Sequence, residues 1–228
     1  MTGLRRRLPG AARLRALMSV AILSAATLAA ASAGETPPLK LVAFGDSLSA
    51  GYLLPASEAF PAVLEKALRA DGYNVAVVNA GVSGDTSSGG LARLDWTLGD
   101  GADAMILELG ANDMLRGIDP DLTRAALDAI LAELKARGIR VVIAGMKANP
   151  TLGKDYGSRF DAIYPDLAAK YDAPLYPFFL AGVAGEPGLR LADGIHPNGA
   201  GVERIVKGIL PTVETFVKAL REKTVAGP

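Results

Sequence analysis

The chain has 228 residues, of which 50% are hydrophobic, 21% are charged and none is cysteine. This length indicates one domain or at most two small ones, and the apolar fraction is ample for a full core, which excludes disordered and collagen-like chains. Without cysteine the protein has no disulfide, thiol nucleophile, zinc-thiolate site or lipid-modified cysteine. The formal net charge is zero, but outside the first 33 residues it is −5, which argues against nucleic acid as a partner.

Residues 1–33 have the three-part pattern of a secretory signal peptide. An arginine-rich start is followed by eighteen uncharged residues, 16–33, that end in the small-residue triplet Ala-Ser-Ala at 31–33. We therefore expect secretion and cleavage before Gly34. A single N-terminal membrane anchor is the alternative, and the twin-arginine route is an alternative to general secretion. No other apolar stretch approaches this length, so we expect the mature chain, 34–228, to be soluble and not stably inserted in a membrane.

The mature chain alternates short apolar runs with helix-length segments. The apolar runs predict five buried strands, at 39–44, 73–79, 103–109, 139–146 and 173–178. Apolar residues at spacings of three and four predict helices at 58–70, 122–137 and 155–170, and a last helix after Asn198 as its N-cap. Pro211 is expected to kink this last helix, or to end it and start another. The alternation predicts one domain with a doubly wound parallel sheet in a three-layer α/β/α sandwich.

Residues that can take part in catalysis or ligand binding follow four of the five predicted strands. These segments are 45–49 (GDSLS), 80–86 (AGVSGDT), 110–113 (GAND) and 193–197 (DGIHP). The last contains His196, the only histidine of the chain. In open α/β sheets, ligands bind beyond the carboxyl ends of the strands, so the four segments are expected to converge on one edge.

These segments contain the side chains that acyl transfer requires. A serine hydroxyl becomes a good nucleophile when a base takes its proton and a third group orients the base, and Ser47, His196 and Asp193 fit those three roles. The backbone N–H groups of Ser47 and Gly84 and the side-chain amide of Asn112 are candidate donors of an oxyanion hole. This scheme requires neither a cofactor nor a metal.

Each segment also has an ordinary structural explanation. Gly-Asp-Ser after a strand is common turn and N-cap chemistry, Asn112 or Asp113 can cap the next helix, and a lone histidine is often a surface residue. Four complementary candidates at one edge favour the catalytic interpretation. A nucleotide or phosphate binder would require a Walker or Rossmann glycine pattern, which the sequence lacks. An α/β-hydrolase would require Gly-x-Ser-x-Gly, which is also absent from the sequence. A non-catalytic flavodoxin-like protein that binds lipid or glycan remains the alternative.

The segment 44–52 (FGDSLSAGY) resembles the first sequence block of the GDSL or SGNH hydrolase superfamily. Gly84, Asn112, and Asp193 with His196 resemble its remaining blocks, in the family order. The likeness covers essentially the whole mature chain. Within the superfamily, the chain is most similar to the periplasmic multifunctional acyl hydrolases of the thioesterase I, lysophospholipase L1 and arylesterase type.

This resemblance implies a flavodoxin-like five-stranded sheet with strand order 2-1-3-4-5. It implies a triad of Ser47, His196 and Asp193 and an oxyanion hole from Ser47, Gly84 and Asn112. It further implies a periplasmic serine esterase that forms an acyl-enzyme on Ser47 and acts on small-molecule aryl esters, acyl thioesters and lysophospholipids.

Two features bear on substrate access. Ala111 stands where members of the family often carry a second glycine, and its methyl group is expected to narrow the approach to Asn112. The segment 147–158 is rich in Gly, Pro and Asn, and it is either a mobile substrate loop or a plain connector.

Overall fold

Five parallel strands form the sheet of this computed structural model, which describes residues 2 and 37–226. The order is β2-β1-β3-β4-β5, as the resemblance implied. The strands are β1 (Leu39–Gly45), β2 (Val75–Gly81), β3 (Ala104–Glu108), β4 (Arg140–Ala144) and β5 (Leu175–Tyr176). Every residue of the central strand β3 is buried, whereas the edge strand β2 is partly exposed, because only central strands are covered on both faces and by two neighbours.

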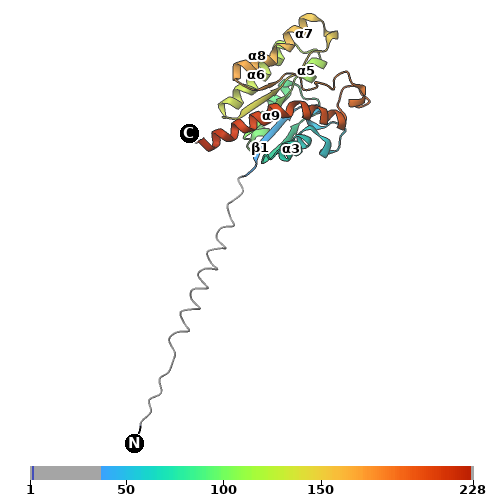
Figure 1. The fold of residues 1–228 in the computed structure, drawn as a ribbon. Coiled ribbons are helices and arrows are strands. Elements are labelled where there is room, and N and C mark those ends of the chain that lie inside the picture. The colour runs from blue at the N-terminus through green and yellow to red at the C-terminus, as the bar shows by residue number, and fades with distance from the viewer. Residues whose placement is uncertain (1, 3–36, 227–228) are drawn as a thin grey trace. The chain divides into compact units, whose positions relative to one another are not determined.

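The longer helices cover the two faces of the sheet in two groups (Figure 1). In one group, α3 (Phe60–Ala70) packs against α9 (Gly199–Ala226). In the other, α6 (Pro120–Ala136) packs against α4 (Ser87–Leu98) and α8 (Ile163–Tyr171). Buried apolar side chains three and four residues apart line the inner face of each helix, so the predicted α/β/α sandwich is confirmed.

The remaining helical segments are short. They are α2 (Ser47–Ala50), α5 (Ala111–Leu115), α7 (Lys154–Asp161), and the 3₁₀ turns η1 (Ala56–Glu58), η2 (Pro150–Leu152) and η3 (Pro187–Leu189). The first two directly follow β1 and β3, so they lie where the sequence placed the candidate site. Within the described residues, no helix is both long enough and apolar enough to span a membrane.

The last helix, which Pro211 was expected either to kink or to end, is continuous. Asn198 caps it as expected, since its Oδ1 accepts the N–H of Gly201 at 3.0 Å. The prediction that Pro211 could end the helix is wrong, because α9 continues from 199 to 226 with Pro211 inside it. Pro211 lies on the exposed face, where water can solvate the carbonyl that loses its helical donor, while the residues on either side of it remain packed.

Several other predicted elements differ from those of the structure. The strand predicted at 173–178 shortens to two residues, since Pro177 has no N–H to continue the ladder. The helix predicted at 155–170 is two helices, α7 and α8. The predicted loop at 147–158 is largely η2 and the first part of α7. The helix α4 has no predicted counterpart, because it begins with Ser-Ser-Gly-Gly, which are poor helix formers.

Candidate active site

The nucleophile candidate begins a tight turn at the carboxyl end of β1. Asp46 caps the short helix α2, its Oδ1 accepting the N–H of Leu48 at 2.9 Å, and Ser47 is the first residue of that helix. Gly45 is required by close approach, because a Cβ there would lie 2.3 Å from Oγ of Ser49 and 2.4 Å from Oε2 of Glu108. Gly-Asp-Ser therefore forms the turn and N-cap that its ordinary structural explanation predicts. The same turn also presents a partly exposed serine at its tip.

The three predicted triad residues form one chain of hydrogen bonds. Nε2 of His196 lies 2.9 Å from Oγ of Ser47, and Nδ1 of His196 lies 2.7 Å from Oδ2 of Asp193. When Nδ1 carries its hydrogen toward the carboxylate, Nε2 is left as an acceptor for the serine hydroxyl. The His196 side chain is 17% exposed, so the imidazole is sheltered but reachable.

Asp193 is itself held in place by the backbone. Its Oδ1 accepts the N–H of Ile195 at 2.8 Å and the N–H of His196 at 3.0 Å. The hydrogen bond from Ile195 and the one from the His196 side chain lower the pKa of Asp193 to about 2. The carboxyl group is therefore ionised at neutral pH.

The loop that carries Asp193 and His196 closes on itself before α9. The N–H of Leu191 donates to the carbonyl of His196 at 2.8 Å, and the N–H of Asn198 donates to the carbonyl of Leu189 at 3.0 Å. These two bonds form a narrow antiparallel hairpin, so the imidazole is presented by a closed loop at a fixed distance from the helix N-terminus.

The predicted oxyanion donor Asn112 lies beside the nucleophile turn. Its Nδ2 donates to Oδ2 of Asp46 at 2.9 Å, which orients the amide next to Ser47 and leaves its second hydrogen available. The prediction that Asn112 or Asp113 caps the helix they enter is wrong, because both lie inside α5. Asp113 instead accepts the N–H of Ser87 at 2.8 Å, at the start of α4.

The third predicted donor, Gly84, sits in the loop between β2 and α4. Its φ of +88° is a left-handed conformation that glycine adopts freely. Nη2 of Arg116 donates to its carbonyl at 2.8 Å, which ties the loop to the end of α5. Val82 in the same loop donates its N–H to the carbonyl of Gly45 at 3.0 Å, so the loop also adjoins the nucleophile turn.

Comparison with known proteins identifies the family of this chain. The model of the GDSL-like lipase/acylhydrolase family matches residues 43–204. The chain belongs to this family. It is 39% identical to the esterase TesA of Pseudomonas aeruginosa, over 90% of this chain and 100% of the relative. It is 43% identical to thioesterase 1/protease 1/lysophospholipase L1 of Escherichia coli K12, over 69% of this chain and 75% of the relative.

Solved structures give the same assignment. The crystal structure of AlinE4, an SGNH-hydrolase family esterase, is 46% identical, with a TM-score of 0.68 over 80% of this chain and 98% of that one. The crystal structure of TesA is 40% identical, with a TM-score of 0.74 over 77% of this chain and 98% of that one. The resemblance to the GDSL or SGNH superfamily is thus confirmed, and this chain is a carboxylic ester hydrolase.

A buried carboxyl group beneath the nucleophile of this GDSL-like hydrolase was missed by the sequence reasoning. Glu108, at the end of β3, is fully buried, and its Oε2 accepts the hydroxyl of Ser49 at 2.7 Å and the N–H of Asp46 at 3.4 Å. Its Oε1 has no hydrogen-bond partner among the described residues. A charged residue at the carboxyl end of an otherwise apolar strand was the signal that could have identified it.

Burial controls the ionisation of this carboxyl pair. Burial raises the pKa of Glu108 well above its usual range, and the nearby charge of Asp46 raises it further. Burial also raises the pKa of Asp46 to about 6, although the hydrogen bonds from Leu48 and Asn112 oppose this. The lower pKa belongs to Asp46, so Asp46 loses its proton before Glu108 does as pH rises.

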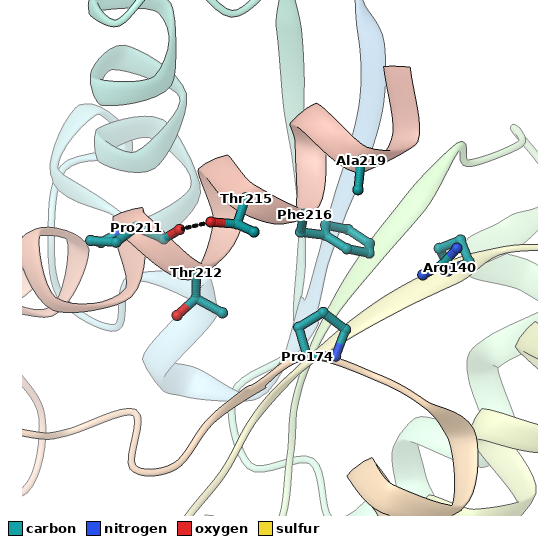
Figure 2. A pocket seen from close by; sticks show the side chains of 7 residues that line it. All are labelled: Arg140, Pro174, Pro211, Thr212, Thr215, Phe216 and Ala219. Atoms are coloured by element: carbon teal, nitrogen blue, oxygen red, sulfur yellow. Dashed lines mark hydrogen bonds between the residues drawn. The ribbon is translucent and has the colours of Figure 1, made fainter. Parts of the chain in front are cut away.

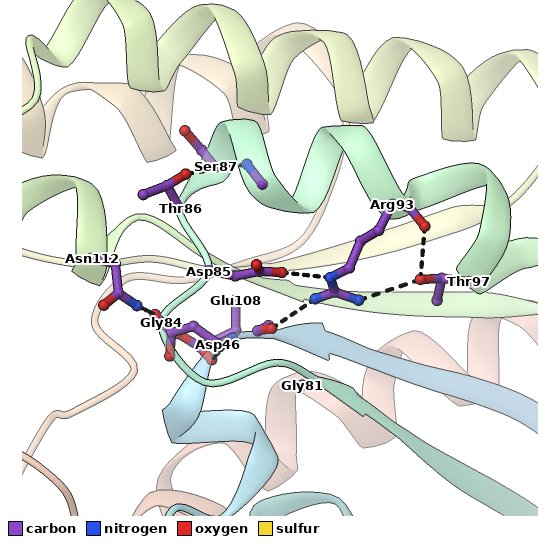
Figure 3. A network of polar contacts seen from close by, with 12 residues as sticks. Asp46, Gly81, Gly84, Asp85, Thr86, Ser87, Arg93, Thr97, Glu108 and Asn112 are labelled. Carbon is purple, nitrogen blue, oxygen red and sulfur yellow. Dashed lines mark hydrogen bonds and ion pairs between the residues drawn. The ribbon is translucent and has the colours of Figure 1, made fainter.

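Arg93 of α4 links the Gly84 loop to the end of β1, just before the candidate nucleophile Ser47 (Figure 3). Its Nε pairs with Asp85, and its Nη2 donates to the carbonyl of Gly45 at 2.9 Å. The guanidinium also lies over the ring of Phe44, 4.1 Å from the centroid. Two of the three segments expected to supply oxyanion donors are thus held together by one largely buried cation.

A hollow of about 400 Å³ lies at the opposite edge of the sheet (Figure 2). Its lining includes Arg140 at the start of β4, Pro174 just before β5, and Phe216 of α9. None of its lining residues is a nucleophile paired with a base. The candidate active site is therefore the partly exposed edge around Ser47 and not this hollow.

Proposed function

We propose that this esterase hydrolyses acyl esters and acyl thioesters, including aryl esters and lysophospholipids, through an acyl-enzyme on Ser47. The observation that carries the proposal is the hydrogen-bonded chain from Ser47 through His196 to Asp193, with separations of 2.9 and 2.7 Å. These distances are short enough for direct proton transfer between the serine and the base. The names of the relatives, esterase, arylesterase and thioesterase/lysophospholipase, support the substrate classes.

In the first half of the reaction, Oγ of Ser47 attacks the carbonyl carbon while its proton moves to Nε2 of His196. The tetrahedral intermediate then collapses, the bond from carbon to the leaving oxygen or sulfur breaks, and the imidazolium returns the proton to that leaving atom. In the second half, water attacks the acyl-enzyme and gives its proton to Nε2, and Ser47 is released with the proton restored to Oγ. Asp193 keeps its charge throughout and stabilises the imidazolium.

The negative charge on the former carbonyl oxygen is stabilised by the N–H groups of Ser47 and Gly84 and by the amide of Asn112. The contact from Asn112 to Asp46 supports this assignment, since it fixes the amide plane beside the nucleophile before substrate binds. Donors that are oriented in advance require no rearrangement as the charge develops.

Exposed apolar side chains that are next in sequence to residues of the site support an acyl substrate. Leu53, 75% exposed, directly follows Tyr52, whose ring contacts the ring of His196. Ile195, 46% exposed, directly precedes His196. Leu115, 53% exposed, is next to Arg116, which contacts the Gly84 loop. Apolar side chains in these positions can cover an acyl chain and remove it from water.

The proposal includes export to the periplasm. Its support is the signal-peptide pattern of residues 1–33, which lie outside the described residues except for Thr2. Expression of the full chain in a bacterial host, followed by cell fractionation and N-terminal sequencing, tests it. We expect a periplasmic protein that begins at Gly34. An uncleaved chain in the membrane fraction would instead support the anchor alternative.

A serine-reactive fluorophosphonate probe tests the catalytic proposal against the non-catalytic alternative. We expect one covalent label, located by peptide mass spectrometry at Ser47, together with hydrolysis of p-nitrophenyl esters and acyl thioesters. The variant Ser47→Ala should lose the label and both activities while keeping the circular dichroism of the parent. Folded parent protein that is neither labelled nor active would support a lipid- or glycan-binding protein.

A further inference from the structure

An aromatic ring lies against the imidazole of the proposed general base. The ring centroids of Tyr52 and His196 are 4.4 Å apart, and the ring planes are inclined by 35°. With Ser47 at Nε2 and Asp193 at Nδ1, the edge nitrogens of the imidazole are both engaged, and Tyr52 occupies a face. The imidazole is thus held from three sides, and only two of these contacts belong to the triad.

Tyr52 is anchored to the element that carries the nucleophile. Its backbone N–H donates to the carbonyl of Ser47 at 3.2 Å, just beyond the end of α2. The next turn is closed by the N–H of Leu54, which donates to the carbonyl of Gly51 at 3.0 Å. The ring therefore joins the Ser47 segment to a base that is 149 positions away in the chain.

The turn that presents Tyr52 is strained at the next residue. Leu53 has a φ of +58°, and the only other non-glycine residue with positive φ among those described is Asp172, in the αL position that follows α8. A branched apolar residue in the left-handed region is an uncommon outlier. Leu53 is also 75% exposed, so burial of its side chain does not explain the strained conformation. This turn geometry brings the ring of Tyr52 into contact with the ring of His196.

We propose that Tyr52 is a positioning residue for the general base: its ring keeps the imidazole of His196 aligned with Oγ of Ser47 and stabilises the imidazolium that forms during each proton transfer. This inference rests on the proposed catalytic role of His196. An aromatic face attracts a cation whose centre lies within about 6 Å, and the attraction is absent from the neutral imidazole. The contact therefore favours the state after proton transfer over the state before it, which lowers the barrier without changing substrate binding.

The kinetic test compares Tyr52→Leu with Tyr52→Phe, using p-nitrophenyl ester hydrolysis. Leucine keeps apolar volume but removes the π-face, so kcat should fall by about 5- to 30-fold with KM nearly unchanged. Phenylalanine keeps the face and should restore kcat to within about two-fold of the parent. Tyr73→Leu, which removes a half-buried tyrosine two residues before β2, is the matched control and should leave kcat and KM unchanged.

Three kinetic outcomes would overturn the proposal. A Tyr52→Leu variant with the kcat of the parent would show that the ring does not assist the base. A fall in Tyr52→Phe equal to that in Tyr52→Leu would assign the effect to the hydroxyl group. A change confined to KM would make Tyr52 part of the substrate-binding surface.

The single histidine allows a test that does not depend on activity. In the parent and in Tyr52→Phe, the carbon-bound protons of the imidazole should show the ring-current displacement of a nearby aromatic face in NMR spectra, and in Tyr52→Leu this displacement should disappear. Identical histidine signals in all three proteins would overturn the stacking itself. Fluorophosphonate labelling of Ser47 and loss of activity in His196→Ala report separately on the proposed function. A parent that is not labelled at Ser47, or a His196→Ala variant that keeps full activity, would refute the catalytic scheme, whatever the tyrosine variants show.

Discussion

The amide of Asn112 is oriented by the residue that precedes the nucleophile: its Nδ2 donates to Oδ2 of Asp46 at 2.9 Å. The same carboxylate accepts the N–H of Leu48 through its other oxygen, at 2.9 Å. Asp46 thus connects α5, which carries the proposed oxyanion donor, with α2, which carries Ser47. Two segments from different strand ends are positioned relative to each other by one buried side chain.

Removal of this oxyanion donor should affect the transition state alone. For Asn112→Ala, we expect kcat to fall by about 10²–10³, or roughly 2.7–4 kcal/mol, with little change in KM, because the amide interacts most strongly with the charge that develops during attack. Steady-state kinetics with a p-nitrophenyl ester measure both constants. A rise in KM at constant kcat would make Asn112 a substrate-binding residue instead.

Two serines of the nucleophile segment should respond in opposite ways. Ser47→Ala should lower turnover by several orders of magnitude with stability unchanged, since it removes the attacking atom. Ser49→Ala should retain much more activity but lower the free energy of unfolding by about 1–3 kcal/mol, since it removes a hydrogen bond to the buried Glu108. Ester hydrolysis and urea denaturation of both variants check this pair. Equal activity in the two variants would refute the assignment of the nucleophile.

The pH dependence of activity should have a steep acid limb. His196 must be neutral to accept a proton, so kcat/KM should rise with pH. Asp193, with a pKa of about 2, stays ionised and adds no step to this limb. Asp46, with a pKa raised to about 6, loses acceptor capacity when it is protonated and releases Asn112. We therefore expect the logarithm of kcat/KM to rise below pH 6 with a slope greater than one.

The variant Asp46→Asn isolates the second ionisation. It should have lower activity because one acceptor is lost, but its acid limb should be less steep than that of the parent, since Asp46 no longer adds an ionisation. A parent slope of one, equal to that of the variant, would exclude Asp46 from the pH dependence. Circular dichroism at each pH provides the control for acid unfolding.

Glu108 should make the fold less stable as pH rises. Its pKa is raised in the folded state, so the fold holds the proton more tightly than the unfolded chain does. The resulting stabilisation is complete below the unfolded value of about 4.3 and is lost as pH rises toward the folded value. In Glu108→Gln, the free energy of unfolding should therefore decrease less between pH 5 and 8 than in the parent. Chemical denaturation across this range checks the slope, and the exposed Glu203→Gln is the matched control, with a parental slope expected.

The amino-acid sequence by itself determined the architecture and the chemistry-bearing residues. Largely apolar runs such as the one at 103–109 identify buried parallel strands, because both faces of such strands are covered. The position of Ser47 after the first strand and of His196 after the fifth places both at one edge, because parallel strands end there together. These are local patterns combined with one topological rule, and that combination is readable from a single chain.

Only the tertiary structure decided which side chains support the triad. Glu108 is a charged residue in an apolar strand, and nothing local shows that the hydroxyl of Ser49 lies 2.7 Å from it. The contact of the Tyr52 ring with His196 depends on a turn at Leu53 whose conformation its residue type disfavours. Contacts of this kind join residues that are far apart in the chain, 59 positions for Ser49 and Glu108. They depend on packing, which specifies side-chain neighbours that neither periodicity nor turn propensity encodes.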